Sequence, residues 1–109
     1  MTNEELVLLI KAGHNSYQEQ LWRQVNRFVA GQAGRYCLLH SERCRSMHLE
    51  LDDFIQVGYF AMLNAIEAYT EESGYKFLTF LGKHLFNEFQ KLTGLRDLSS
   101  KSQKSRKRQ

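Results

Sequence analysis

Two cysteines and two histidines lie close together in the chain, with a spacing that could serve metal binding. They form the pattern C-x2-H-x3-C-x3-H at Cys37, His40, Cys44 and His48. Thiolate and imidazole are ligands that zinc takes in tetrahedral structural sites. The spacing matches none of the usual zinc patterns, and burial at a helix end would also account for Cys37. We therefore expect free thiols, no metal and no other cofactor.

A second set of residues has catalytic types but no catalytic arrangement. His40, Ser41 and Glu42 follow one another in sequence, whereas a nucleophile, a base and an orienting group must converge in space. The sequence has no glycine-rich loop of the kind that cradles phosphates. Asp52 and Asp53 suit the first turn of a helix, where acids complement the positive end of the helix dipole. We therefore expect a binding protein and not an enzyme.

A polar stripe follows the helix that we expect between about residues 51 and 69. The other side of this helix is apolar, and the stripe consists of Asp53, Gln56, Tyr59, Asn64 and Glu67. Carboxylates and amides at helical spacing suit a partner rich in arginine, because bidentate pairs fix the register of the contact. A merely solvated face is the alternative interpretation.

Aromatic side chains lie beside cations between residues 69 and 84. Tyr75 and Phe80 are close in sequence to Lys76 and Lys83. An aromatic platform returns about 1–3 kcal/mol of stacking to a base that has left its duplex, and lysines can meet phosphates. We expect Phe77 in the core instead, because it shares an apolar helical stripe with Leu81, Leu85 and Phe89.

The charge of the chain is unevenly distributed. The 109 residues carry a formal net charge of +3, of which residues 95–109 contribute +5, with six basic residues and one acid, and residues 1–94 contribute −2. The folded part is therefore not a basic nucleic-acid surface as a whole. No run of about eighteen apolar residues is present, and the N-terminus is acidic, unlike a secretory signal. We expect no membrane contact and a cytoplasmic location.

The elements that position these residues are expected to be helical throughout. Proline is absent, and apolar residues recur at steps of three and four. This periodicity predicts an all-α fold, with a single small domain of about four helices over residues 1–94 and a disordered basic tail over residues 95–109. The helices fall near residues 2–13, 16–36, 51–69 and 76–92. Residues 40–50 are polar and without period, and we predict a loop there.

One ordered set of motifs resembles region 2 of the bacterial sigma-70 family. It consists of Asp53-Phe54-Ile55-Gln56-Val57-Gly58, then Leu63, Ala65 and Gly74, then Lys76-Phe77-Leu78-Thr79-Phe80. The family pattern is an acid, an apolar pair, glutamine, any residue and glycine, followed by an amphipathic helix, a glycine turn and Phe-x-Thr-aromatic. The resemblance covers residues 50–89 well and residues 3–93 loosely. It is similar in type to the sigma-like proteins of conjugative elements in Gram-positive bacteria.

The resemblance implies a transcription initiation module with two binding surfaces. The helix from residue 51 would dock on the clamp helices of the largest subunit of core RNA polymerase, through Asp52, Asp53, Gln56, Val57, Tyr59 and Leu63. The turn and the last helix would engage the promoter −10 element and help to open promoter DNA, through Tyr69, Thr70, Tyr75, Lys76, Thr79, Phe80, Lys83 and His84. An anti-sigma protein as a further partner is left open.

The sequence also departs from the family pattern. Val57 replaces a usual acid, Lys83 and His84 stand where promoter-melting members carry two tryptophans, and Phe86 replaces a typical arginine. The family's C-terminal helix-turn-helix has no counterpart in residues 95–109, which a truncated reading frame would explain. Two alternatives stay open. One is a polymerase-binding regulator that does not initiate transcription, and the other is a duplex-DNA-binding regulator of a mobile element.

Overall fold

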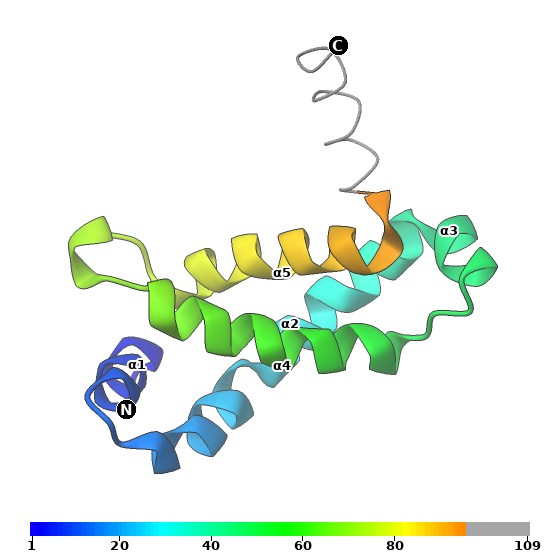
Figure 1. Ribbon diagram of the computed structural model, residues 1–109. Coiled ribbons are helices and arrows are strands. Elements are labelled where there is room, and N and C mark those ends of the chain that lie inside the picture. The colour runs from blue at the N-terminus through cyan, green and yellow to red at the C-terminus, as the bar shows by residue number, and fades with distance from the viewer. Residues whose placement is uncertain (96–109) are drawn as a thin grey trace.

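Two antiparallel helices form the centre of the fold. The computed structural model describes residues 1–95, in which α4, Leu51–Ala68, and α5, Phe77–Thr93, lie side by side (Figure 1). The connection between them, residues 69–76, contains a short 3-10 turn, η2, Glu71–Ser73, which is followed by Gly74, whose φ of +78° is left-handed. Glycine adopts this conformation without the steric cost that a Cβ would add.

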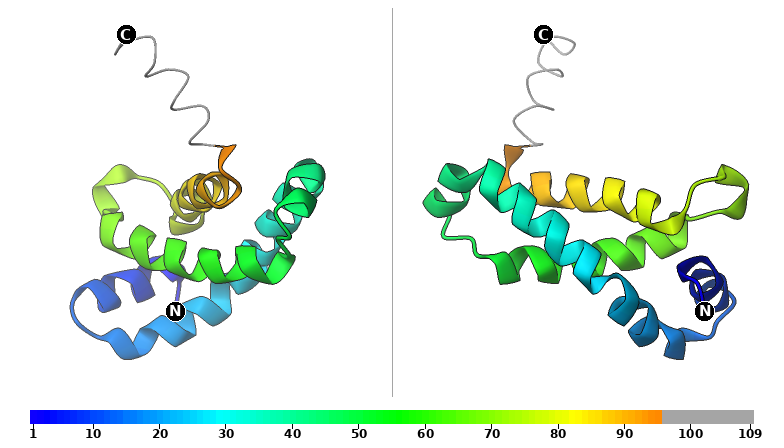
Figure 2. Two further views of the ribbon diagram at one scale, coloured as in Figure 1. Left: turned by 45° about the vertical axis from the view of Figure 1, so that its right-hand side comes forward. Right: turned by 180° about the vertical axis from the view of Figure 1, so that it is seen from behind.

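The remaining helices cover this pair. Helix α2, Gln18–Leu39, crosses α4 and α5, as the views in Figure 2 show. Helix α1, Asn3–Lys11, precedes it, followed by the 3-10 turn η1, Asn15–Tyr17. Helix α1 lies at the end of the pair where α4 stops and α5 begins (Figure 1). The described residues contain no strand, and the prediction of an all-α fold is confirmed.

The core lies where α2, α4 and α5 meet. Each helix contributes a stripe of side chains at helical spacing that is removed from water, as amphipathic helices require. Gly58 allows α2 and α4 to approach closely, since a Cβ at this position would collide with Cγ1 of Val29. The largest fully buried side chains are Phe54, Phe77, Phe89, Leu6, Leu21, Met62, Leu81 and Leu85.

The predicted loop over residues 40–50 is wrong, because the structure has a short helix there, α3, Ser41–Ser46. Cys44 belongs to the core at 6% exposure, and Arg43 donates a hydrogen bond from Nε to the carbonyl oxygen of Thr93 at 2.7 Å. A two-turn helix with a single buried residue leaves no periodic pattern in the sequence.

The boundary of the predicted tail also shifts. We placed its start at residue 95, but Leu95 is partly buried and packs against the core. The rest of the predicted tail, residues 96–109, lies outside the described residues.

Candidate functional site

One face of α4 carries side chains that are exposed to solvent. We call it the α4 face, and its exposed members are Asp52, Gln56, Phe60, Asn64 and Glu67. These positions follow helical steps of three and four, so they form one continuous stripe. Of the stripe predicted from the sequence, Gln56, Asn64 and Glu67 point outward, whereas Asp53 and Tyr59 are half-buried.

Other predicted polymerase-binding residues serve the fold as well as the surface. Asp53 is half-buried, and its Oδ2 accepts a hydrogen bond from the backbone N–H of Glu50 at 2.8 Å, which caps the start of α4. The ring of Tyr59 meets that of Trp22 edge to face, with centroids 5.2 Å apart. Val57 is half-buried against the core. A substitution at these three positions would therefore change packing or capping together with any partner contact.

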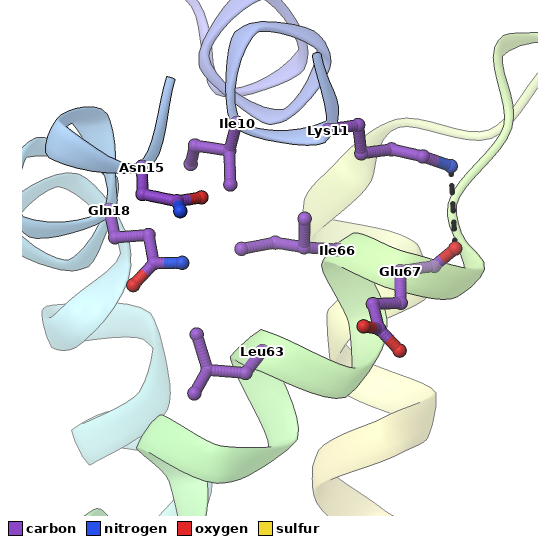
Figure 3. Close-up of a pocket in the computed structure, with 7 residues that line it drawn as sticks. All are labelled: Ile10, Lys11, Asn15, Gln18, Leu63, Ile66 and Glu67. Carbon is purple, nitrogen blue, oxygen red and sulfur yellow. Dashed lines mark hydrogen bonds between the residues drawn. The ribbon is translucent and has the colours of Figure 1, made fainter. Parts of the chain in front are cut away.

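Leu63 sits at the edge of a shallow cavity between α1 and α4. The cavity is also lined by Ile10, Lys11, Asn15, Gln18, Ile66 and Glu67 (Figure 3). Leu63 is half-buried there and packs against the core. Its apolar side chain borders the α4 face and adds a hydrophobic margin to it.

Phe60 is a member of the α4 face that the sequence reasoning missed. Its side chain is 63% exposed, which is unusual for a phenylalanine and places a large apolar ring among polar neighbours. Such aromatic side chains are enriched at protein–protein interfaces. The signal was present in the spacing, because Phe60 lies four residues after Gln56 and four before Asn64.

The second surface lies on α5 and on the connection before it. Thr70, Tyr75, Lys76, Thr79 and Lys83 are exposed, and we call them the α5 face. Nζ of Lys83 lies 4.8 Å from the centroid of the Tyr75 ring, which is within the range of a cation–π contact. A cation and an aromatic plane are therefore presented together, as the sequence predicted.

Phe80 and His84 extend this surface inward. Both are half-buried, and their rings are 4.9 Å apart between centroids, one helical turn from each other. The Phe80 ring also meets that of Tyr69 edge to face at 5.8 Å. Phe77 is fully buried, as we predicted. The exposed α5 face thus rests on a layer of aromatic rings.

Tyr69 is a correction to the predicted promoter-contacting set. Its side chain is 3% exposed, and its hydroxyl donates a hydrogen bond of 2.9 Å to the carbonyl oxygen of Tyr75. Burial, and then the nearby carboxylates of Glu4 and Glu71, raise the pKa of the Tyr69 phenol above its ordinary value. In this conformation Tyr69 supports the connection from inside and does not form part of the exposed surface.

A groove between α2 and α5 adjoins the α5 face. It has a volume of about 600 Å³ and is lined by Phe28, Gln32, Leu78, Thr79, Gly82, Lys83, Phe86 and Asn87. Phe86, which stands where the family typically has arginine, is 51% exposed. An aromatic ring therefore lies on the rim of this groove next to a lysine.

The two surfaces differ in charge. Helix α4 holds three acids, Asp52, Asp53 and Glu67, and no lysine or arginine. Residues 75–93 hold Lys76, Lys83 and Lys91 with one acid, Glu88. The acidic helix suits a basic protein partner, whereas the lysines on α5 suit phosphates. A folded part with a net negative charge therefore contains a segment in which lysines outnumber acids.

The cysteine and histidine cluster does not come together as a ligand set. Within residues 1–95, no three side chains among the histidines, cysteines, aspartates and glutamates form a metal-binding group. Both thiols are free, and burial, followed by repulsion from Cys44, raises the pKa of Cys37 to about 11. The zinc alternative therefore finds no support in this part of the chain.

Comparison with known proteins places the chain in a family. The family model for sigma-70 region 2 matches residues 21–91, which include most of α2, all of α3 and α4, and most of α5. The chain therefore belongs to the sigma-70 region 2 family, whose role is to bind RNA polymerase. No curated protein and no solved structure gave a significant match. Among residues 1–95, no helix has the length and hydropathy needed to cross a bilayer.

Proposed function

We propose that this protein is a sigma-like initiation module that acts by binding and not by catalysis. It docks on core RNA polymerase through the α4 face and engages the non-duplex strand of the promoter −10 element through the α5 face. The module acts in the cytoplasm, where the polymerase is found. Its origin in a conjugative element stays a prediction from the sequence resemblance.

The observation that carries the proposal is the outward orientation of the α4 face. Asp52, Gln56, Asn64 and Glu67 are exposed on a helix whose opposite side is buried. Carboxylates and amides at this spacing can make bidentate contacts with arginines of a basic coiled coil, such as the clamp helices of the largest polymerase subunit. Phe60 supplies the apolar anchor that such an interface needs at its centre.

The α5 face supports the promoter-binding half of the proposal. Stacking on Tyr75 compensates a base for the stacking that it loses when it leaves the duplex, and Lys76 and Lys83 neutralise adjacent phosphates. On the α5 face, Lys83 and His84 stand where promoter-melting members of the family carry two tryptophans. We therefore expect the protein to retain an already open strand more readily than it opens a closed duplex.

Two binding assays test the proposal. The first measures capture of core polymerase by the wild-type protein and by a Gln56→Ala, Phe60→Ala, Asn64→Ala variant, with Glu42→Ala on α3 as a control that removes a remote acid. We expect the triple change to abolish capture and the control to leave it unchanged. Undiminished capture by the triple variant would exclude the α4 face as the docking surface.

The second assay measures retention of a −10 single strand by the polymerase complex. If the wild-type complex retains the strand and Lys83→Gln weakens this retention, promoter engagement is supported. Polymerase capture without strand retention indicates a polymerase-binding regulator instead. Affinity for duplex DNA without polymerase would indicate a duplex-binding regulator, against which the negative charge of the folded part argues.

A further inference from the structure

Helix α1 lies outside residues 21–91, the segment that matches the family, yet it contacts the connection that carries part of the α5 face. This connection, residues 69–76, joins the end of α4 to the start of α5. One side chain of α1 reaches each end of it. These two contacts span more than fifty residues of sequence and bring opposite charges to the two helix ends.

Lys11 holds the end of α4. Its Nζ donates hydrogen bonds to the carbonyl oxygens of Tyr69 at 2.5 Å and Glu67 at 3.3 Å, the second of which is drawn in Figure 3. The last carbonyl groups of a helix have no partner within the helix, and they form the negative end of its dipole. An ammonium group therefore satisfies both the hydrogen bonding and the electrostatics of this helix end.

Glu4 holds the start of α5. Its Oε2 accepts a hydrogen bond of 2.7 Å from the backbone N–H of Phe77. The residue at the capping position, Lys76, makes no capping bond with its own side chain. A carboxylate from a distant helix thus takes the role that a local serine, threonine or aspartate usually plays.

The connection is also tied within itself. The hydroxyl of Tyr69 donates to the carbonyl oxygen of Tyr75 at 2.9 Å, and that of Ser73 donates to the carbonyl oxygen of Thr70 at 2.9 Å. The backbone of Tyr75 is therefore fixed between an internal bond and the clamped start of α5. Its ring and the neighbouring Lys83 keep their cation–π contact at the surface.

We propose that α1 is a clasp that positions the connection for the promoter strand, with Glu4 and Lys11 as positioning residues that do not touch the strand. The strand-binding part of this inference rests on the proposed function. Without the clasp, the two ends of residues 69–76 lose their fixed partners, and Tyr75 and Lys76 sample conformations that do not fit a strand. The exposed side chains of the α4 face do not take part in either contact, so polymerase docking is preserved.

Amide hydrogen exchange in the full chain tests the clasp independently of any ligand. We expect Glu4→Ala to raise the exchange of the Phe77 amide about tenfold relative to the α2 amides, since a charge-assisted hydrogen bond is lost. Glu4→Gln keeps an acceptor oxygen and should restore most of the protection. Glu19→Ala, which removes an exposed acid on α2, should leave the exchange of the Phe77 amide unchanged.

Lys11→Ala provides a second variant, at an exposed position. We expect it to raise amide exchange in residues 69–76 as well. Unchanged exchange in both Glu4→Ala and Lys11→Ala overturns the clasp, whatever the protein binds. An equal rise in the α2 amides also contradicts it, because that result shows a general loss of stability.

Strand retention by the polymerase complex then separates the clasp from the proposed function. We expect about tenfold weaker retention for Glu4→Ala and Lys11→Ala, with unchanged capture of polymerase. Equal retention by the wild type and both variants overturns the positioning role. If the wild type retains no strand while its exchange pattern is as expected, the promoter function and strand positioning both fail, and the clasp stands as a feature of the fold.

Discussion

Arg43 donates a hydrogen bond from Nε to the carbonyl oxygen of Thr93 at 2.7 Å, so that α3 closes the C-terminal end of α5. The cation lies at the negative end of the helix dipole, which favours it. We expect Arg43→Ala to lower the free energy of unfolding by about 1–3 kcal/mol, because a charge-assisted bond to a partly buried carbonyl is lost.

Chemical denaturation measures this effect, and Arg45→Ala is the matched control. Arg45 lies on the same short helix and is exposed. Within residues 1–95, its side chain forms no hydrogen bond. Equal stability of the two variants would show that the Arg43 contact contributes nothing to folding.

The packing of α2 against α4 depends on the missing side chain of Gly58. A methyl group there would collide with Cγ1 of Val29, a stiff branched side chain, and would also contact Leu85. We expect Gly58→Ala to destabilise the fold by about 1–3 kcal/mol through overpacking. Thermal unfolding monitored by circular dichroism would measure the loss.

At Gly31, in contrast to Gly58, we expect an alanine to stabilise the fold. It lies inside α2, and a Cβ there would meet no atom within 4 Å. Gly31→Ala should therefore stabilise the protein by about 0.5–1 kcal/mol, because alanine loses less backbone entropy in a helix. If both alanines shifted stability in the same direction, close packing at Gly58 would not be the cause.

Tyr75 and Lys83 form the exposed part of the α5 face most suited to a base and its phosphate. We expect Tyr75→Ala to weaken binding of a −10 single strand by about 1–3 kcal/mol, since a stacking platform is removed. Tyr75→Phe keeps the ring and should bind nearly as the wild type does. Fluorescence anisotropy of a labelled strand in the polymerase complex gives both affinities, and equal loss in the two variants would argue against stacking.

The thiol of Cys37 gives a pH-dependent prediction. Burial raises its pKa from 9.0 to about 11, so the unfolded chain loses this proton at lower pH than the folded chain does. Between about pH 9 and 11 the folded state binds more protons, and its stability falls as the pH rises. Cys37→Ala should reduce this fall, which urea titrations at several pH values would detect.

Reactivity of the same thiol gives an independent check. At pH 8 the thiolate fraction of Cys37 should be roughly a hundredfold lower than that of an unperturbed cysteine, so alkylation of the folded protein should be slow. Alkylation at the rate of a free thiol would contradict the raised pKa.

The long helices were predictable because each buries a periodic apolar stripe, and the outward direction of Gln56 and Glu67 followed from the same periodicity. The short helix around Cys44 was not predictable, since one buried residue creates no period. The burial of Tyr69 and the roles of Glu4 and Lys11 also escaped prediction. Glu4 and Lys11 act through contacts with segments more than fifty residues away in the sequence. Tyr69 is buried because residues 69–76 fold back so that its hydroxyl reaches the carbonyl oxygen of Tyr75.

The most direct test of the account places a photo-crosslinking amino acid at position 56, in the middle of the α4 face, and mixes the protein with core RNA polymerase. We predict a crosslink to the clamp helices of the largest subunit, and none from the same group placed at Glu42 on α3. Polymerase binding without a crosslink from position 56, or with an equal crosslink from position 42, would contradict docking through the α4 face.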